Sequence, residues 1–270
     1  MDWGFLAGQR WATEGAVASL TRGVVINCGS PANTEGSWTE IVASTAFSAD
    51  GLLLNFTRTA AMDSLLDIAI GASSEAIIIP DLLLSNGGSN GWFAESVFVP
   101  IAVPANTRLS ARAQGTSAAT SCHLTIMEVA LGFEASRYLQ RVVNYGTNDA
   151  DSGGTQVDPG GSLNTKGAWS QLTAATTANH KGLLIALGMQ TRSWVSVSAL
   201  LDIGIGPATE TVLIPNIEIG TSSTVDTFLP QIMGPFWVDI PSGTRLTARA
   251  QKNYASAGGR EFDVAVYGIG

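Results

Sequence analysis

The feature that most constrains this chain is an internal repeat with a spacing of about 135 residues. Leu65–Gly71 reads LLDIAIG and Leu200–Gly206 reads LLDIGIG, so the two segments differ at a single position. Pro104–Gln114 (PANTRLSARAQ) and Pro241–Gln251 (PSGTRLTARAQ) are closely similar as well. The spacing shifts by only a few residues along the chain, which indicates two copies of one fold with loops of different length.

The matched segments set the expected domain boundaries. The first copy is predicted to run from about residue 20 to 132 and the second from about 139 to 270, both ordinary sizes for a domain. Residues 1–19 have no counterpart in this alignment and are predicted to form an N-terminal arm. The junction between the copies is short, so we expect the two domains to be held in a fixed relation.

The repeated segments are typical of β-strands. They are short and are bounded by Gly, Pro, Asn and Ser, and Thr107–Gln114 alternates between two faces with a period of two. Prolines inside apolar runs, such as Pro80 and Pro215, are expected at strand ends, edges or bulges. The pattern predicts an all-β protein of two tandem β-sandwich domains. A jelly roll is favoured over an immunoglobulin-like topology, because the Cys–Trp–Cys pattern of antibody domains is absent.

The composition narrows the partners. Charged residues make up 13% of the chain, the net charge is −8, and no cluster of Lys and Arg is present, which argues against nucleic acid. No secretory signal or long apolar run is present, so we expect synthesis in a cytoplasm and no membrane insertion. Cys28 and Cys122 match no zinc spacing and are predicted to be buried thiols.

Acidic and basic residues recur at matched positions of both copies. One interpretation is a carboxylate with an anion-binding arginine pair, and the other is a cross-strand salt bridge that both copies need in order to fold. The structural interpretation is favoured, because residues shared by both halves are most simply those that build the fold. The residues concerned are Asp67, Arg108 and Arg112 in the first copy and Asp202, Arg245 and Arg249 in the second.

Aromatic and apolar residues in loops are the candidate contact sites. Trp92 and Phe93, and Phe228 and Leu229, place apolar side chains in loops where the two copies differ. They are expected to bind a sugar ring or a neighbouring subunit, or else to fold back over the core. The N-terminal arm is predicted to dock on another protein or to lie on its own first domain, through Trp3, Phe5, Leu6 and Trp11.

Catalytic patterns are missing from the sequence. The two histidines, His123 and His180, are unmatched between the copies, and the metalloprotease, Walker A and nucleophile-elbow spacings are not found. We therefore expect no enzyme activity, no metal site and no cofactor. A polysaccharide depolymerase on a β scaffold stays open as an alternative, and its mark would be two carboxylates about 5–10 Å apart in one cleft.

The run from Asn164–Trp169 (NTKGAW), through LLDIGIG, to the segment P-x-G-T-R-L-x-A-R-x-Q resembles virion proteins of tailed bacteriophages, and Asn33–Trp38 (NTEGSW) is the looser form in the first copy. The resemblance covers residues 20–270 and rests on fold-forming segments. It implies a non-enzymatic fibre, spike or capsid-decoration subunit in the virion, a homo-oligomer with three-fold symmetry in many cases, and other virion proteins as partners. A host surface glycan is the alternative partner.

Overall fold

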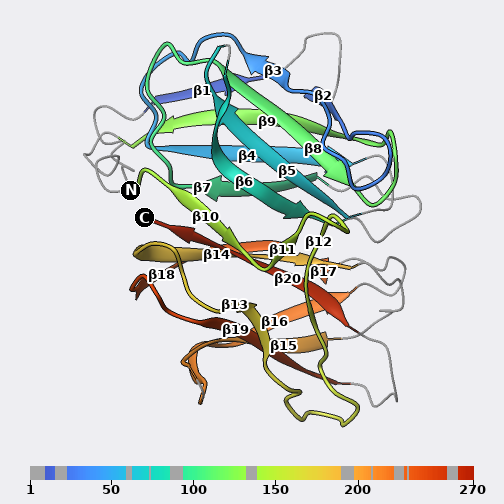
Figure 1. The fold of residues 1–270 in the computed structure, drawn as a ribbon. Helices are drawn as coiled ribbons and strands as arrows, with labels where there is room; N and C mark the ends of the chain where they lie inside the picture. Colours follow the sequence, from blue (N-terminus) through green and yellow to red (C-terminus); the bar gives the residue numbers. More distant parts are fainter. Residues whose placement is uncertain are drawn as a thin grey trace, which may run out of the picture.

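The structure is a computed structural model, and it describes residues 10–15, 23–58, 63–72, 74–85, 94–131, 139–189, 198–207, 209–221, 228–229, 231–253 and 261–270. Within these ranges every regular element is a β-strand, and no helix is long and apolar enough to span a membrane. The prediction of an all-β chain of two tandem β-sandwiches is therefore confirmed. Figure 1 shows the two sandwiches, one above the other.

The first sandwich has the strand order of a jelly roll. One sheet runs β2-β9-β4-β7 and the other runs β3-β8-β5-β6, so consecutive strands alternate between the sheets, except for the hairpin of β5 and β6. Its strands are β2 (Val24–Asn27), β3 (Thr39–Val42), β4 (Gly51–Arg58), β5 (Ser64–Ile70), β6 (Ala76–Leu84), β7 (Ala94–Val99), β8 (Leu109–Gly115) and β9 (Ser121–Ala130).

The second sandwich repeats this order. Its sheets run β12-β20-β14-β18, with β10 also on β20, and β13-β19-β15-β16-β17. Its strands are β10 (Val142–Tyr145), β11 (Thr147–Asn148), β12 (Gly153–Val157), β13 (Ser170–Thr173), β14 (His180–Gly188), β15 (Ser198–Ile205), β16 (Thr211–Thr221), β17 (Phe228–Leu229), β18 (Ile232–Ile240), β19 (Leu246–Lys252) and β20 (Phe262–Ile269).

Part of the N-terminal arm belongs to the first sandwich. Strand β1 (Arg10–Glu14) pairs antiparallel with the last half of β9, as β10 pairs with the last half of β20. Arg10–Glu14 therefore has a counterpart after all, and it is Val142–Tyr145. The alignment missed it because an edge strand makes few contacts that constrain its side chains, so RWATE and VVNY share no residue pattern.

Two expectations about local structure are confirmed. Pro80 and Pro215 lie in β6 and β16 at irregularities of the pairing with β5 and β15, and the residues after them, Asp81 and Asn216, have positive φ angles of 46° and 51°. Asp and Asn tolerate this backbone region better than most residues. Cys28 and Cys122 are buried, are not joined in a disulfide, and both belong to the first core.

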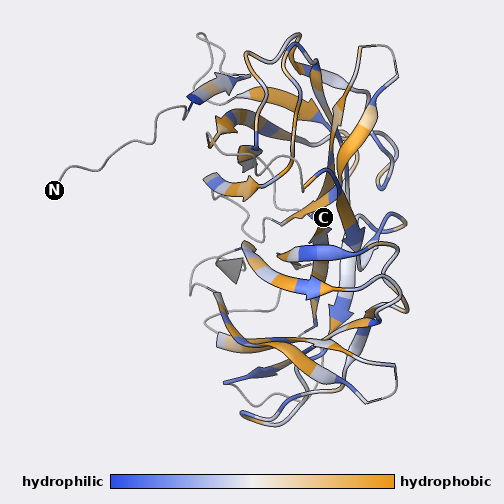
Figure 2. Ribbon diagram, turned by 90° about the vertical axis from the view of Figure 1, so that its left-hand side faces the viewer, coloured by the Kyte–Doolittle hydropathy of each residue, from blue (hydrophilic) through white to orange (hydrophobic). Residues whose placement is uncertain are grey.

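The two sandwiches are docked through a shared apolar cluster. The edge strands β6 and β7 of the first sandwich lie against β10, β14 and β18 of the second, and β20 lies at the junction in Figure 1. Figure 2 shows the C-terminus, which follows β20, between the two sandwiches. The outward face of the second sandwich joins the first core through Val142, Leu184, Ala186, Ile232, Ala265, Tyr267 and Ile269. An apolar interface of this kind holds domains in a fixed relation.

Polar groups complete the junction. The hydroxyl of Tyr267, which is fully buried, donates to the carbonyl of Asp81 (2.7 Å) and accepts from the amide of Leu83 (2.7 Å). Because β6 is an edge strand, its outward-facing backbone groups would otherwise lack partners. On the neighbouring edge, Glu95 Oε1 of β7 accepts from the amides of Gln231 and Ile232 (3.0 and 2.8 Å).

The same edge of the second copy is built differently. Leu83, which is buried at the junction, corresponds to Glu218, which is exposed on β16. A charged residue on an edge strand disfavours pairing and packing with another chain. The equivalent edge of the second sandwich therefore carries an exposed charge where the first sandwich has a buried leucine.

Candidate functional site

Three carboxylates come together beside the junction, in the first sandwich. Glu35 precedes β3 in the NTEGSW segment, Asp67 lies in the middle of β5, and Asp81 lies at the bulge of β6. One carboxylate oxygen from each residue lies within 4.8 Å of the others. The amide of Asp81 donates to Asp67 Oδ1 (2.8 Å), which fixes the bulge against the buried aspartate.

The second sandwich covers one side of this cluster. Asn144 of β10 donates to Asp81 Oδ2 (2.7 Å), and the side-chain amide of Gln114 donates to the carbonyl of Asp149 (2.8 Å). Ser152 of the second copy donates to Asn33 Oδ1 (2.9 Å). The carboxylates are thus held between two domains that are already docked.

The negative charge of the cluster is poorly compensated. Burial and the charges of Asp67 and Asp149 raise the pKa of Asp81 to about 7. Burial also raises the pKa of Glu35, and the neighbouring Asp67 adds to this, although the Arg112 guanidinium opposes it. Both shifts have the same physical cause, which is that several carboxylates share one partly desolvated place.

The matched place in the second copy contains a cation. There the residues are Lys166, Asp202 and Asn216, which correspond to Glu35, Asp67 and Asp81. The ammonium of Lys166 donates to Asp202 Oδ1 (2.7 Å) and to the carbonyl of Leu200 (3.0 Å). Burial opposes the ionisation of Asp202, but the hydrogen bonds from Lys166, the Asn216 amide and Arg249 outweigh it and lower the pKa.

Arg112 and Arg249 form the cross-strand pairs that the repeat suggested. Arg112 Nε binds Asp67 Oδ2 (2.8 Å) and Arg249 Nε binds Asp202 Oδ2 (3.0 Å), and each aspartate lies directly opposite its arginine in the sheet. Each guanidinium also lies over an indole ring, at 4.5 Å from the Trp38 centroid and 4.4 Å from that of Trp169. These contacts explain why the tryptophan of the NT-x-G-x-W segment recurs.

The other matched arginines, Arg108 and Arg245, do not reach the aspartates. Arg245 binds Gln171 Oε1 (3.0 Å), the carbonyl of Gly206 (3.2 Å) and the carboxylate of Glu210. Arg108 binds Glu40, Glu75 and the carbonyl of Gly71 in the same manner. The arginines of each copy are therefore separated, and the interpretation as an anion-binding pair has no geometric support.

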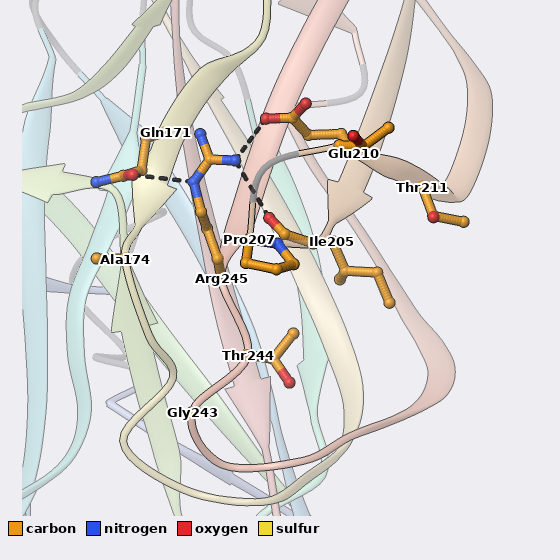
Figure 3. Close-up of a pocket in the computed structure, with 11 residues that line it drawn as sticks. Gln171, Ala174, Ile205, Pro207, Glu210, Thr211, Gly243, Thr244 and Arg245 are labelled. Carbon is orange, nitrogen blue, oxygen red and sulfur yellow. Dashed lines mark hydrogen bonds and ion pairs between the residues drawn. The ribbon is translucent and has the colours of Figure 1, made fainter.

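The cleft around Arg245 is shown in Figure 3. It has a volume of about 830 Å³ and lies between the β15–β16 turn and the segments before β14 and β19, with Ile205 and Pro207 among its apolar lining residues. Arg245 points at Glu210 and Gln171 within it, so its Nε and Nη1 groups are bound by neighbouring residues (Figure 3). Among the described lining residues Glu210 is the single carboxylate, so no carboxylate pair faces this cleft.

A second acidic pair is buried at the junction itself. Asp63, just before β5, and Asp263, in β20, are 2% and 1% exposed. Ser85 Oγ donates to Asp63 Oδ1 (2.5 Å). Burial, and then the adjacent charge of Asp63, raise the pKa of Asp263 to about 8, so Asp263 keeps its proton at neutral pH.

Trp237 forms an exposed aromatic platform on the second sandwich. It lies on edge strand β18 opposite Gly182 of β14, and its side chain is 60% exposed. A Cβ atom at Gly182 would lie 3.1 Å from the indole, so the ring lies close over the glycine. The exposed ion pair of Lys181 and Asp239 (2.8 Å) lies in the same two strands.

The aromatic candidates from the sequence are placed only in part. Trp3, Phe5, Leu6, Trp92 and Phe93 lie outside the described residues, and the side chains of Phe228 and Leu229 do as well, although their backbone forms β17. Trp11 lies in β1 and is 56% exposed. Glu35, Asp81 and Trp237 were not among the site residues predicted from the sequence. The first two carried a signal, because they change charge between two otherwise matched segments.

The comparisons with known proteins give structural neighbours only. No protein-family model and no curated protein matches the chain significantly. A structure of PNGF-II matches with a TM-score of 0.43 at 10% identity, and the match covers 97% of the present chain. The match covers only 65% of the PNGF-II chain, so the present chain spans less than two thirds of the length of PNGF-II. The N-terminal CBM22-1–CBM22-2 tandem domain of Xyn10C from Paenibacillus barcinonensis has a TM-score of 0.25 at 11% identity, with 97% and 91% coverage.

Proposed function

We propose that this chain is a non-enzymatic structural protein of a tailed-bacteriophage virion, a fibre, spike or decoration subunit that acts as a rigid two-domain unit. The observation that carries the proposal is the docking of the sandwiches, in which the fully buried Tyr267 bonds the β6 edge across a shared apolar cluster. A subunit that holds other virion proteins at a set distance and orientation needs domains that are fixed relative to each other.

The use of the repeated polar residues supports this proposal. The aspartates and arginines that both copies share bind one another or backbone carbonyls within their own sandwich. These residues therefore stabilise the same fold in each of the two copies. The resemblance of the NT-x-G-x-W and P-x-G-T-R-L-x-A-R segments to phage virion proteins points in the same direction.

The test is whether the chain is part of a particle. Virions from a lysate of the host that carries the encoding genome are purified on a density gradient, and their proteins are identified by mass spectrometry. We expect the chain in the particle fractions at a fixed ratio to the capsid protein. Its absence from particles, together with a purified chain that stays monomeric, would contradict the proposal.

Attachment is expected through the N-terminal segment, in which Trp11 is the docking candidate that falls within the described residues. An indole that is 56% exposed on an edge strand is an apolar contact available to a neighbouring protein. The variant Trp11→Ala is expected to reduce incorporation into particles without changing the stability of the chain. If the native chain and the Trp11→Ala variant were incorporated equally, Trp11 would not be part of the docking surface.

Glycan binding is the second candidate function, and Trp237 favours it. A flat, exposed indole beside hydrogen-bonding side chains is suited to stacking on a sugar ring. On a glycan array, Trp237→Ala is expected to abolish binding, while Trp11→Ala, an exposed tryptophan on the other sandwich, serves as the matched control. Binding that is lost with Trp92→Ala instead would move the site to the loop before β7.

A further inference from the structure

The internal repeat allows the acidic cluster to be compared with a matched site in the same molecule. Asp67 and Asp202 occupy the same register position, each accepts from the amide of the bulge residue at 2.8 Å, and each binds the arginine opposite. In the second copy this set of acceptors binds the Lys166 ammonium, through Asp202 Oδ1 and the carbonyl of Leu200. The shared framework is therefore a cation-binding one.

The first copy has the acceptors without that cation. Its residue at the position of Lys166 is Glu35, and its residue at the position of Asn216 is Asp81. Arg112 is the counterpart of Arg249, because each binds the aspartate opposite it and lies over a tryptophan ring. Arg112 also pairs with the Glu35 carboxylate, and among the described residues no second cation replaces the Lys166 ammonium. With all three carboxyls ionised, as an ion would require, three carboxylates and one guanidinium give the first cluster a charge of −2, whereas the second, with one carboxylate, one ammonium and one guanidinium, is at +1.

The geometry of the first cluster suits a divalent ion with oxygen ligands. Calcium binds oxygens at about 2.4 Å, so two of its ligands lie at most about 4.8 Å apart. The oxygens of Glu35, Asp67 and Asp81 lie within that limit, and the carbonyl of Leu65 corresponds to the Leu200 carbonyl that binds the ammonium. Glu35 is exposed, which leaves room for water in the remaining coordination positions.

We propose that Glu35, Asp67 and Asp81 bind a calcium ion at the place that the Lys166 ammonium occupies in the second copy. A charge of +2 would neutralise the cluster. The ion would also strengthen the junction, because Asp81 is held by Asn144 and its backbone carbonyl by Tyr267, both of the second sandwich. The proposal is independent of where the protein acts.

The second copy also supplies the variants for the test. Glu35→Lys with Asp81→Asn gives the first cluster the residues of the second, and Lys166→Glu with Asn216→Asp gives the second those of the first. Both sets already exist in a folded sandwich of this chain, so both variants are expected to fold, which circular dichroism checks. Calcium chloride is titrated calorimetrically into each chelator-treated, full-length protein, and thermal unfolding is followed with and without calcium.

The native chain is expected to bind one calcium ion with a Kd of about 1 mM or tighter, and to unfold at a higher temperature in its presence. The E35K/D81N variant is expected to lose both effects, and the K166E/N216D variant is expected to bind two ions. The proposal fails if the native chain shows neither heat nor a thermal shift at about 5 mM calcium. It also fails if E35K/D81N binds as the native chain does, or if folded K166E/N216D binds no additional ion.

Discussion

Tyr267→Phe tests whether the two sandwiches form one rigid unit. The change removes a single oxygen that is fully buried at the junction and that bonds the Asp81 carbonyl and the Leu83 amide, both at 2.7 Å. Each buried backbone group left without a partner costs about 1–3 kcal/mol. Since phenylalanine avoids the desolvation of the hydroxyl, the expected loss in the free energy of unfolding is about 2–4 kcal/mol.

The assay is urea unfolding followed by tryptophan fluorescence and circular dichroism, because coincident curves report a single cooperative unit. Tyr145→Phe is the matched control. Its hydroxyl accepts from the Thr177 amide (3.0 Å) and contacts His180 (2.8 Å) inside the second sandwich, so it leaves the junction intact. We expect Tyr267→Phe, and not Tyr145→Phe, to separate the unfolding of the two sandwiches. A loss below about 0.5 kcal/mol would mean that water reaches β6 and that the docking is loose.

Three further outcomes follow from contacts elsewhere in the chain. Asp263, whose pKa is raised to about 8, keeps a proton in the folded protein that the unfolded chain loses near pH 4, so stability falls as the pH rises between these values; Asp263→Asn should reduce that slope by about 1.4 kcal/mol per pH unit in urea titrations, and an unchanged slope would exclude Asp263 as its source. Asp202→Asn should cost about 3 kcal/mol, because Lys166 and Arg249 lose their shared carboxylate, and a cost near zero would show that solvent replaces the pair. Leu83 lies next to Gly188 at the junction, and the second copy carries Glu218 at the matched position. Leu83→Glu should therefore enlarge the radius of gyration measured by solution scattering, whereas an unchanged radius would argue that the junction tolerates a charge.

The glycan-binding candidate and the calcium site are separable by experiment. Trp237 lies on β18, while Asp67 and Asp81 lie on β5 and β6 of the other sandwich. Trp237→Ala is therefore expected to leave calcium binding unchanged, and E35K/D81N to leave glycan binding unchanged. A protein that binds sugar only with calcium would instead place both sites in one functional unit.

The repeat and the period-two alternation predicted the tandem sandwiches, because both follow from short-range patterns that every strand carries. The Asp67–Arg112 and Asp202–Arg249 pairs were foreseeable for the same reason, since residues needed by both copies recur in both. The counterpart of β1 was not foreseeable, because an edge strand leaves little pattern in its side chains.

What only the tertiary structure decided is how the copies face each other. Three features of the structure bring together segments that are distant in sequence: the burial of Leu83 with Tyr267, the Asp63–Asp263 pair, and the cluster of Glu35, Asp67 and Asp81. The sequence alone determined that two copies of one fold exist and which residues they share. Their docking depends on the complementarity of one edge with one sheet face, and no local pattern along the chain encodes that match.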